Sequence, residues 1–152
     1  AGDRGFDIHV DAIGEAAVYD AVDALSVTRS AGYKKNAFVL AMDTVSDPQE
    51  LTDACAQYDI CQTGLTLNSW NDPWACIGNA KTPEEAVDML TIDAAIQLGI
   101  SERYGSIEKG RHADFTIFDE NPLEMKSLDE FKHLRSVMTV VNGAVVYDTE
   151  EV

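Results

Sequence analysis

Basic residues are scarce in this chain of 152 residues. It carries 11 lysines and arginines against 27 aspartates and glutamates, a formal net charge of −16 at pH 7. Nucleic acids and anionic membranes are bound through basic surfaces, so this balance argues against both as partners. No apolar run approaches the roughly 18 residues of a membrane-spanning helix. The first ten residues also lack the basic and apolar regions of a signal peptide, and we therefore expect a cytoplasmic protein.

Cysteine is also rare, with Cys55, Cys61 and Cys76 and no Cys-x-x-Cys spacing. An odd number of cysteines without that spacing predicts neither a disulfide framework nor a zinc knuckle. We expect reduced, partly buried thiols, which is the habit of free cysteine. The apolar fraction of 45% allows a sizeable core and excludes a disordered chain.

The last third of the chain has the pattern of short strands. Asn142-Gly143 stands between the β-branched runs 137–141 and 144–147. Both central residues of a type I′ turn need a positive φ, so this dipeptide predicts a hairpin. Residues 113–119 predict a further strand, and residues 129–136 a turn or short helix before the hairpin.

The first part of the chain alternates between strand and helix patterns. Residues 6–10 predict a strand, Gly14 a tight turn, residues 16–25 a helix and residues 26–36 a connecting loop. An apolar run at 38–42 predicts a buried parallel strand. Ser46 or Asp47 then caps a helix that has Pro48 in its first turn and ends near residue 58. Residues 60–67 predict the next strand.

A further helix is predicted after residue 82. Thr82 and Glu85 form a capping box around Pro83, and acidic residues at the start suit the helix dipole. Gly99 is placed to end this helix. The predicted apolar stripe consists of Val87, Leu90, Thr91, Ala94 and Leu98.

One signature runs through the region after this helix: Gly105-Ser106-Ile107-x-x-Gly110-x-x-Ala113-Asp114-x-x-x-x-Asp119-x-x-Pro122. It resembles the C-terminal signature of metal-dependent amidohydrolases, specifically the amidohydrolase family 3 branch that includes an exoenzyme-regulatory type of protein. The resemblance implies an α/β fold. Residues 1–100 would be the later part of a (β/α)₈ metallohydrolase barrel, and residues 101–152 a small C-terminal β-module. Because such a barrel needs roughly 250 residues and the chain begins without methionine, we expect an excised C-terminal portion.

The resemblance also implies metal ligands at the ends of two early strands. The position where the family has a ligand histidine, just before Ala-Ile-Gly-acid, is Asp11 here, and the nearest imidazole is His9. Period two places both side chains on one strand face, so they are the candidate metal ligands, with a structural role as the alternative. The second ligand histidine would fall at Ala41 or Met42. Asp43 is the closest substitute.

Asp72 is the candidate catalytic residue. It lies in Ser69-Trp70-Asn71-Asp72-Pro73, which is similar to the setting of the family's aspartate that activates water. An aspartate before proline is also a common turn residue. His112 and His133 belong to no ligand motif and are expected at the surface.

By resemblance, the parent enzyme would use a divalent metal, zinc above all, to hydrolyse a non-peptide C–N bond in a small-molecule amide or cyclic amide. This chain alone presents an incomplete ligand set, so we do not expect it to be active by itself. A degenerate, non-catalytic scaffold with a binding or regulatory role is the main alternative, and an acidic module binding divalent ions is a weaker one. Since a partial barrel leaves strand edges uncovered, we expect either a missing N-terminal half or a homo-oligomer.

Overall fold

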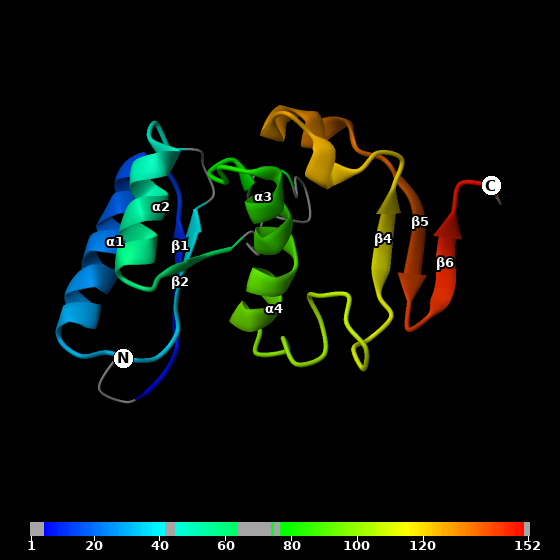
Figure 1. Cartoon of the computed structure of the whole chain (residues 1–152). Coiled ribbons are helices and arrows are strands. Elements are labelled where there is room, and N and C mark those ends of the chain that lie inside the picture. The colour runs from blue at the N-terminus through cyan, green and yellow to red at the C-terminus, as the bar shows by residue number, and fades with distance from the viewer. Residues whose placement is uncertain (1–4, 42–44, 64–73, 75–76, 151–152) are drawn as a thin grey trace. The chain divides into compact units, whose positions relative to one another are not determined.

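The computed structural model describes residues 5–41, 45–63, 74 and 77–150. The chain divides into two compact units, Ala1–Lys81 (unit 1) and Thr82–Val152 (unit 2). Both contain helices and strands, which confirms the mixed α/β class (Figure 1). The boundary at residue 100, between a partial barrel and a β-module, stays a prediction. None of the helices formed by the described residues combines the length and hydropathy required to span a bilayer.

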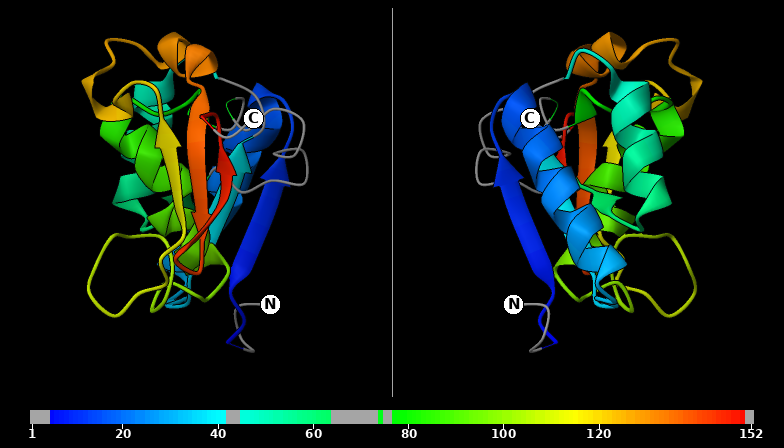
Figure 2. Two further views of the ribbon diagram at one scale, coloured as in Figure 1. Left: turned by 90° about the vertical axis from the view of Figure 1, so that its right-hand side faces the viewer. Right: turned by 90° about the vertical axis from the view of Figure 1, so that its left-hand side faces the viewer.

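Unit 1 is built from strands joined by helices. Strands β1 (Ile8–Ala12), β2 (Ala37–Ala41) and β3 (Cys61–Gln62) pair in that order, and both pairings are parallel. Helices α1 (Glu15–Ser30) and α2 (Pro48–Gln57) make the connections and lie beside one another (Figure 2). The parallel strand expected at 38–42 is therefore confirmed. Of the strand predicted at 60–67, the part from residue 64 lies outside the described residues.

Helix α1 is longer than its sequence pattern indicated. The prediction of a loop from residue 26 is wrong, because the helix continues to Ser30. Hydroxyl groups in these turns bond to the helix's own backbone. Ser26 donates to Asp23 O at 2.8 Å, and Thr28 donates to Ala24 O at 2.8 Å. Polar residues that favour turns are thereby accommodated inside the last helical turns.

Local signals fix where the two helices begin. Gly14, with φ of 86°, forms the turn between β1 and α1, a backbone conformation that L side chains rarely adopt. At α2, the carboxylate of Asp47 accepts a hydrogen bond from the Glu50 N–H at 2.9 Å, and Pro48 occupies the first turn. The predicted cap of α2 is confirmed, with Asp47 rather than Ser46 in that role.

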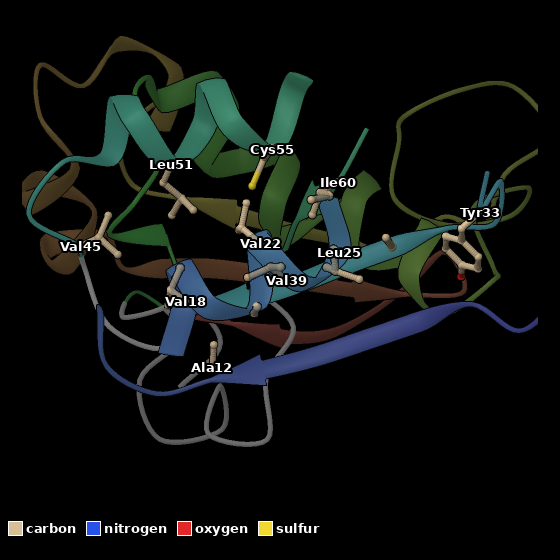
Figure 3. Close-up of a cluster of buried hydrophobic side chains, with 12 residues drawn as sticks. Ala12, Val18, Val22, Leu25, Tyr33, Val39, Val45, Leu51, Cys55 and Ile60 are labelled. Carbon is tan, nitrogen blue, oxygen red and sulfur yellow. The ribbon is translucent and has the colours of Figure 1, made fainter. Parts of the chain in front are cut away.

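The core of unit 1 lies between its sheet and its two helices (Figure 3). Side chains of β1 and β2 at alternate positions point toward the helices, and the helices meet them with one apolar stripe each. The side chains that form this cluster are Ala12, Val18, Ala21, Val22, Leu25, Tyr33, Ala37, Val39, Val45, Leu51, Cys55 and Ile60. Apolar burial on one face of the sheet is thus the main source of stability in unit 1.

Unit 2 contains an antiparallel sheet of order β4-β5-β6. Its strands are β4 (Phe115–Phe118), β5 (Ser136–Val141) and β6 (Ala144–Asp148), which lie side by side in Figure 2. Two 3₁₀ helices, Pro122–Glu124 and Leu128–His133, connect β4 to β5. The predicted strands and the predicted turn or helix after residue 129 are confirmed.

The single helix predicted after Thr82 is two helices. Helix α3 (Pro83–Leu90) ends and α4 (Ile92–Gln97) begins at Thr91, whose φ of −123° and ψ of −89° are not helical. The capping box is confirmed in part, since Thr82 Oγ1 accepts from the Glu85 N–H at 3.1 Å. The predicted apolar stripe is wrong: the buried residues are Ala86, Met89 and Ala95.

The hairpin between β5 and β6 has the predicted turn. Asn142 and Gly143 have φ values of 52° and 78°, as a type I′ turn requires. Two bonds fix this turn to the segment before β4. The Asn142 N–H donates to Asp114 Oδ1 at 2.6 Å, and the Gly143 N–H donates to Ala113 O at 2.9 Å. The Ala-Asp pair of the signature therefore holds a turn 28 residues further along the chain.

Candidate active site

The carboxyl edge of the unit 1 sheet is the edge at which an active site is expected. Because the strands are parallel, the ends of β1 at Ala12, β2 at Ala41 and β3 at Gln62 share one edge. Open α/β sheets and α/β barrels both place their functional side chains at this edge, on the loops that follow the strands. The segments 42–44 and 64–73 follow two of these strands and lie outside the described residues.

His9 and Asp11 share one face of β1, as period two predicts. Both are exposed, whereas Ile8, Val10 and Ala12 between and beside them turn toward the helices. Residues two apart on a strand are separated by about 6.6 Å along it, so the two side chains can approach one small ligand. The structure therefore brings the two predicted metal ligands onto a common face.

An aromatic contact orients the imidazole of His9. Its ring stacks on the ring of Phe38 in β2, with centroids 4.7 Å apart and planes 27° from parallel. Phe38 is the register partner of His9 in the β1–β2 pairing and is buried. The side chain of His9 is consequently held over the sheet face that is turned away from α1 and α2.

Carboxylates are concentrated near the carboxyl edge of the sheet. Ser46, which follows β2, donates a hydrogen bond to the Glu15 carboxylate at the start of α1. Desolvation first, and then the negative charges of Glu50, Glu15 and Asp47, raise the pKa of Tyr19 above its usual value. The local potential is thus negative, which favours cations over anions at this edge.

The described residues do not complete a metal site. An imidazole and a carboxylate suit zinc chemically, but His9 and Asp11 are two donors, and a catalytic zinc usually has three from the protein. No group of three or more His, Cys, Asp or Glu side chains with ligand geometry occurs among the residues that the structure describes. Asp43 and the candidate catalytic residue Asp72 lie outside those residues. The two donors alone do not support a metal-dependent catalytic step.

The remaining histidines lie in unit 2. His133 is exposed, as expected. His112 is half-buried, and its ring stacks on Tyr104 with centroids 4.5 Å apart and planes 9° from parallel. Its Nδ1 lies 2.9 Å from Asn142 Oδ1. His112 therefore takes part in fixing the hairpin turn.

Sequence reasoning did not find the structural roles of two arginines. Arg29 at the end of α1 donates to the carbonyl oxygens of Tyr58 at 3.0 Å and Lys35 at 2.6 Å. Arg111 in unit 2 donates to the carbonyls of Ser101 and Tyr104. The available signal was an arginine beside a glycine turn, which by itself does not say which carbonyls the guanidinium will reach.

Unit 1 thus defines a parallel β/α arrangement with two polar candidate residues on one face of its first strand. A family model described as the amidohydrolase family matches residues 46–147 of this sequence. The chain belongs to the amidohydrolase family.

The similar curated relatives are much longer proteins. The imidazolonepropionase of Shewanella frigidimarina is 47% identical over 60 residues, which are 40% of this chain and 13% of that protein. The imidazolonepropionase of Christiangramia forsetii is 48% identical over 48 residues, 32% of this chain and 12% of that protein. The matched segments therefore span only about an eighth of these relatives.

Solved amidohydrolases share the fold. An amidohydrolase from Thermotoga maritima superposes with a TM-score of 0.59 at 20% identity, covering 96% of this chain and 38% of that structure. A second solved amidohydrolase superposes with a TM-score of 0.55 at 18% identity, covering 96% of this chain and 46% of its own. At such low identity the likeness concerns the fold alone.

Proposed function

We propose that this chain supplies the later strands of the catalytic barrel and the C-terminal β-module of a metal-dependent amidohydrolase. That enzyme would hydrolyse a non-peptide C–N bond in a small-molecule amide or cyclic amide. Family membership supports hydrolysis as the reaction class. The printed name of the relatives, imidazolonepropionase, supports a small molecule as the substrate.

One observation carries the proposal. His9 and Asp11 stand together on the face of the parallel strand β1 that is turned away from the helices, with Asp11 next to the strand's last residue. In the complete barrel of this proposal, that face would point into the barrel, where structural residues are normally bulky and branched. Two polar side chains of the types that bind zinc are better explained by a ligand on that face.

Any bound ion would need further ligands from outside the described residues. In this proposal Asp72 takes a proton from water, the role suggested by its Ser-x-x-Asp-Pro setting. A divalent ion, when bound, would supply the Lewis acidity that makes the water acidic. The chain by itself is expected to bind metal without turning over substrate.

The test is zinc binding by the 152-residue chain and its variants. Protein purified without chelator is loaded with zinc, dialysed and analysed for metal content. We expect His9→Ala and Asp11→Asn each to weaken zinc affinity at least about tenfold, since each removes one of few ligands. Asp23→Asn changes an exposed carboxylate on α1 and serves as the matched control, with unchanged affinity expected.

Failure of the proposed metal site and failure of the proposed reaction are distinguished by two measurements. Equal zinc affinity in the parent and in both strand variants would show that zinc binds elsewhere and would overturn the proposed site. Hydrolysis is tested separately, with the longest natural form of the protein that contains these residues and a panel of small linear and cyclic amides. If that protein cleaves none of them with zinc bound, the proposed reaction is wrong.

A second candidate function is a degenerate scaffold that binds or regulates without catalysis. It is favoured by Asp11 where the family has histidine and by Ala41, an apolar residue, near the place of the second ligand. This candidate predicts no stoichiometric zinc even after loading. It also predicts that His9→Ala and Asp11→Asn leave every metal measurement unchanged.

Self-association of the isolated chain remains a prediction. Strand edges and apolar strand faces of a partial barrel need a cover, which a second copy can provide. Sedimentation at high protein concentration is the measurement. A strictly monomeric species would contradict the prediction.

A further inference from the structure

The hairpin turn of unit 2 carries a reactive dipeptide. In an Asn-Gly pair the backbone nitrogen of the glycine can attack the side-chain carbonyl carbon of the asparagine. A C–N bond forms, ammonia leaves, and the resulting cyclic imide takes up water to give aspartate or isoaspartate. The reaction needs no enzyme, oxidant or cofactor, and glycine permits it because no side chain shields the attacking nitrogen.

At Asn142-Gly143, three bonds oppose the geometry that this reaction needs. The attacking nitrogen is occupied, since the Gly143 N–H donates to Ala113 O at 2.9 Å. The backbone of Asn142 is held by its own N–H, which donates to Asp114 Oδ1 at 2.6 Å. The side-chain oxygen of Asn142 lies 2.9 Å from His112 Nδ1, so the carbonyl is also held in place.

The backbone conformation adds a fourth constraint. Asn142 and Gly143 both have positive φ values, 52° and 78°, in a two-residue turn that is fixed by the strand pairing on either side. Closing the five-membered imide would require the asparagine to leave this conformation. The turn must therefore open before the nitrogen can reach the carbonyl carbon.

The geometry points to Asn142-Gly143 as a conditional modification site: deamidation is blocked while the turn is held by residues 112–114 and proceeds when the β5–β6 hairpin opens. Because deamidation is irreversible, the product is a lasting record that the hairpin has opened. Aspartate at position 142 would place a second carboxylate near that of Asp114, because Asp114 accepts the hydrogen bond from the backbone N–H of residue 142. Isoaspartate adds a backbone methylene that a two-residue turn of fixed register cannot accommodate.

The experiment follows deamidation at residue 142 by mass spectrometry of the full chain and of the peptide containing the turn, at mildly alkaline pH. Native protein is compared with the same protein in urea. We expect deamidation to be slower in the native state by about tenfold or more, corresponding to at least about 1.4 kcal/mol for opening the turn. Equal rates in the two states would overturn the proposal.

A pair of variants tests the part played by Asp114. Asp114→Ala removes the acceptor of the Asn142 N–H and is expected to speed native-state deamidation about tenfold. Asp119→Ala is the matched control, because Asp119 Oδ1 likewise accepts a hydrogen bond from a backbone N–H. The donor is Arg135, at a distance of 3.0 Å, and this bond does not involve the turn. The proposal fails if Asp119→Ala speeds deamidation as much as Asp114→Ala does.

Should Asp114→Ala not fold, Asp114→Asn replaces the carboxylate by a weaker, neutral acceptor and is expected to speed deamidation by a smaller factor, still more than Asp119→Ala does. Hydrogen exchange of the Gly143 amide gives a second measurement on the unmodified protein. Deamidation and exchange at Gly143 must then show the same dependence on low urea concentrations, since both need the turn to open. Different dependences would overturn the proposal.

Discussion

The two units of this chain are stabilised in different ways. Unit 1 has a parallel sheet with one face covered by α1 and α2, and its buried cluster draws on β1, α1, β2 and α2. In unit 2, β6 is exposed along most of its length, with Val145 and Val146 at 53% and 60% exposure. The hairpin of unit 2 is stabilised to a larger degree by hydrogen bonds to residues of the family signature.

This difference shows what the family signature does. Asp114 fixes the hairpin turn, Asp119 accepts the backbone N–H of Arg135, and Gly105 fits against the junction of α3 and α4. All three act on backbone geometry in unit 2. The candidate chemistry instead lies in unit 1, at strand ends where the sequence departs from the family pattern. These signature residues are therefore structural, whereas the proposed function depends on the less typical residues of unit 1.

Leu51→Ala is expected to have the largest effect and tests the apolar half of this comparison. The Leu51 side chain is fully buried in the unit 1 cluster. Truncation removes buried methyl groups and leaves a cavity, at a cost of about 2–5 kcal/mol. Urea unfolding followed by circular dichroism measures the loss. Leu123→Ala, at a 48% exposed position in unit 2, is the control and should cost under about 0.5 kcal/mol.

Hydrogen exchange on the Leu51→Ala variant sharpens the comparison. Protection should fall for amides of α1, α2 and β1–β3 and stay nearly unchanged for β4–β6. Equal loss of protection in both units would show that they unfold together, and the contrast drawn between them would then be wrong.

Gly105→Ala tests the backbone geometry of unit 2. Gly105 has φ of +92°, and an added Cβ would lie 2.8 Å from both Ala95 Cβ and Ile92 Cα. A left-handed conformation and overpacking together are expected to cost about 2–4 kcal/mol. Gly110→Ala is the control, because its φ is similar, +97°, but no atom lies within 4 Å of the added Cβ. The stability losses of the two variants, measured by thermal unfolding, should differ by the cost of overpacking at Gly105. Equal losses would contradict a packing role for Gly105.

Local sequence signals predicted much of the fold because their causes are local. The Asn-Gly turn, the Asp47 cap and the Thr82 cap each depend on residues within three positions of one another. The end of α1 and the break at Thr91 were missed for a shared reason. At both places a hydroxyl bonds to the helix backbone, yet α1 continues past Ser26 and Thr28 while α3 ends before Thr91. Such a residue is compatible with either outcome, so the sequence does not say where the helix ends.

The candidate site was predictable only in part. Period two placed His9 and Asp11 on one face, which the strand geometry bears out. The stacking of His9 on Phe38 was not predictable, because it depends on the register between β1 and β2, 29 residues apart in sequence. Likewise, the tie between Asp114 and Asn142 spans 28 residues and appears only once the sheet is formed.

Alkaline pH should weaken unit 1 through Cys55. Burial raises the pKa of the Cys55 thiol from its usual value near 9.0 to about 12. The unfolded thiol therefore ionises first as pH rises, so stability is complete below about pH 9 and falls from there toward pH 12. The slope is about 1.4 kcal/mol per pH unit for one proton. Urea unfolding at pH 8 to 10 should show this decrease, and Cys55→Ala should show a shallower one; identical slopes would exclude Cys55 as the cause.

The smallest expected effects concern exposed ion pairs, which should not distinguish the two units. The pKa of Asp53 in unit 1 is lowered first by the hydrogen bond from Gln49 and then by Lys81. In unit 2, the hydrogen bond and charge of Lys132 lower the pKa of Asp129. A carboxyl group whose pKa is lowered in the folded state stabilises that state at pH values above its ordinary pKa. This contribution is lost as the pH falls through the folded-state pKa.

A pair of lysine variants separates these two surface contacts. Lys132→Ala removes the principal partner of Asp129, so NMR titration should find its pKa back near the usual value. Lys81→Ala leaves the bond from Gln49 in place, so the pKa of Asp53 should stay below its usual value. Gln49→Ala should likewise leave the pKa of Asp53 below its usual value, because the hydrogen bond and the charge of Lys81 remain. A return of this pKa to its usual value in either single variant would mean that one contact alone favours the ionised carboxylate.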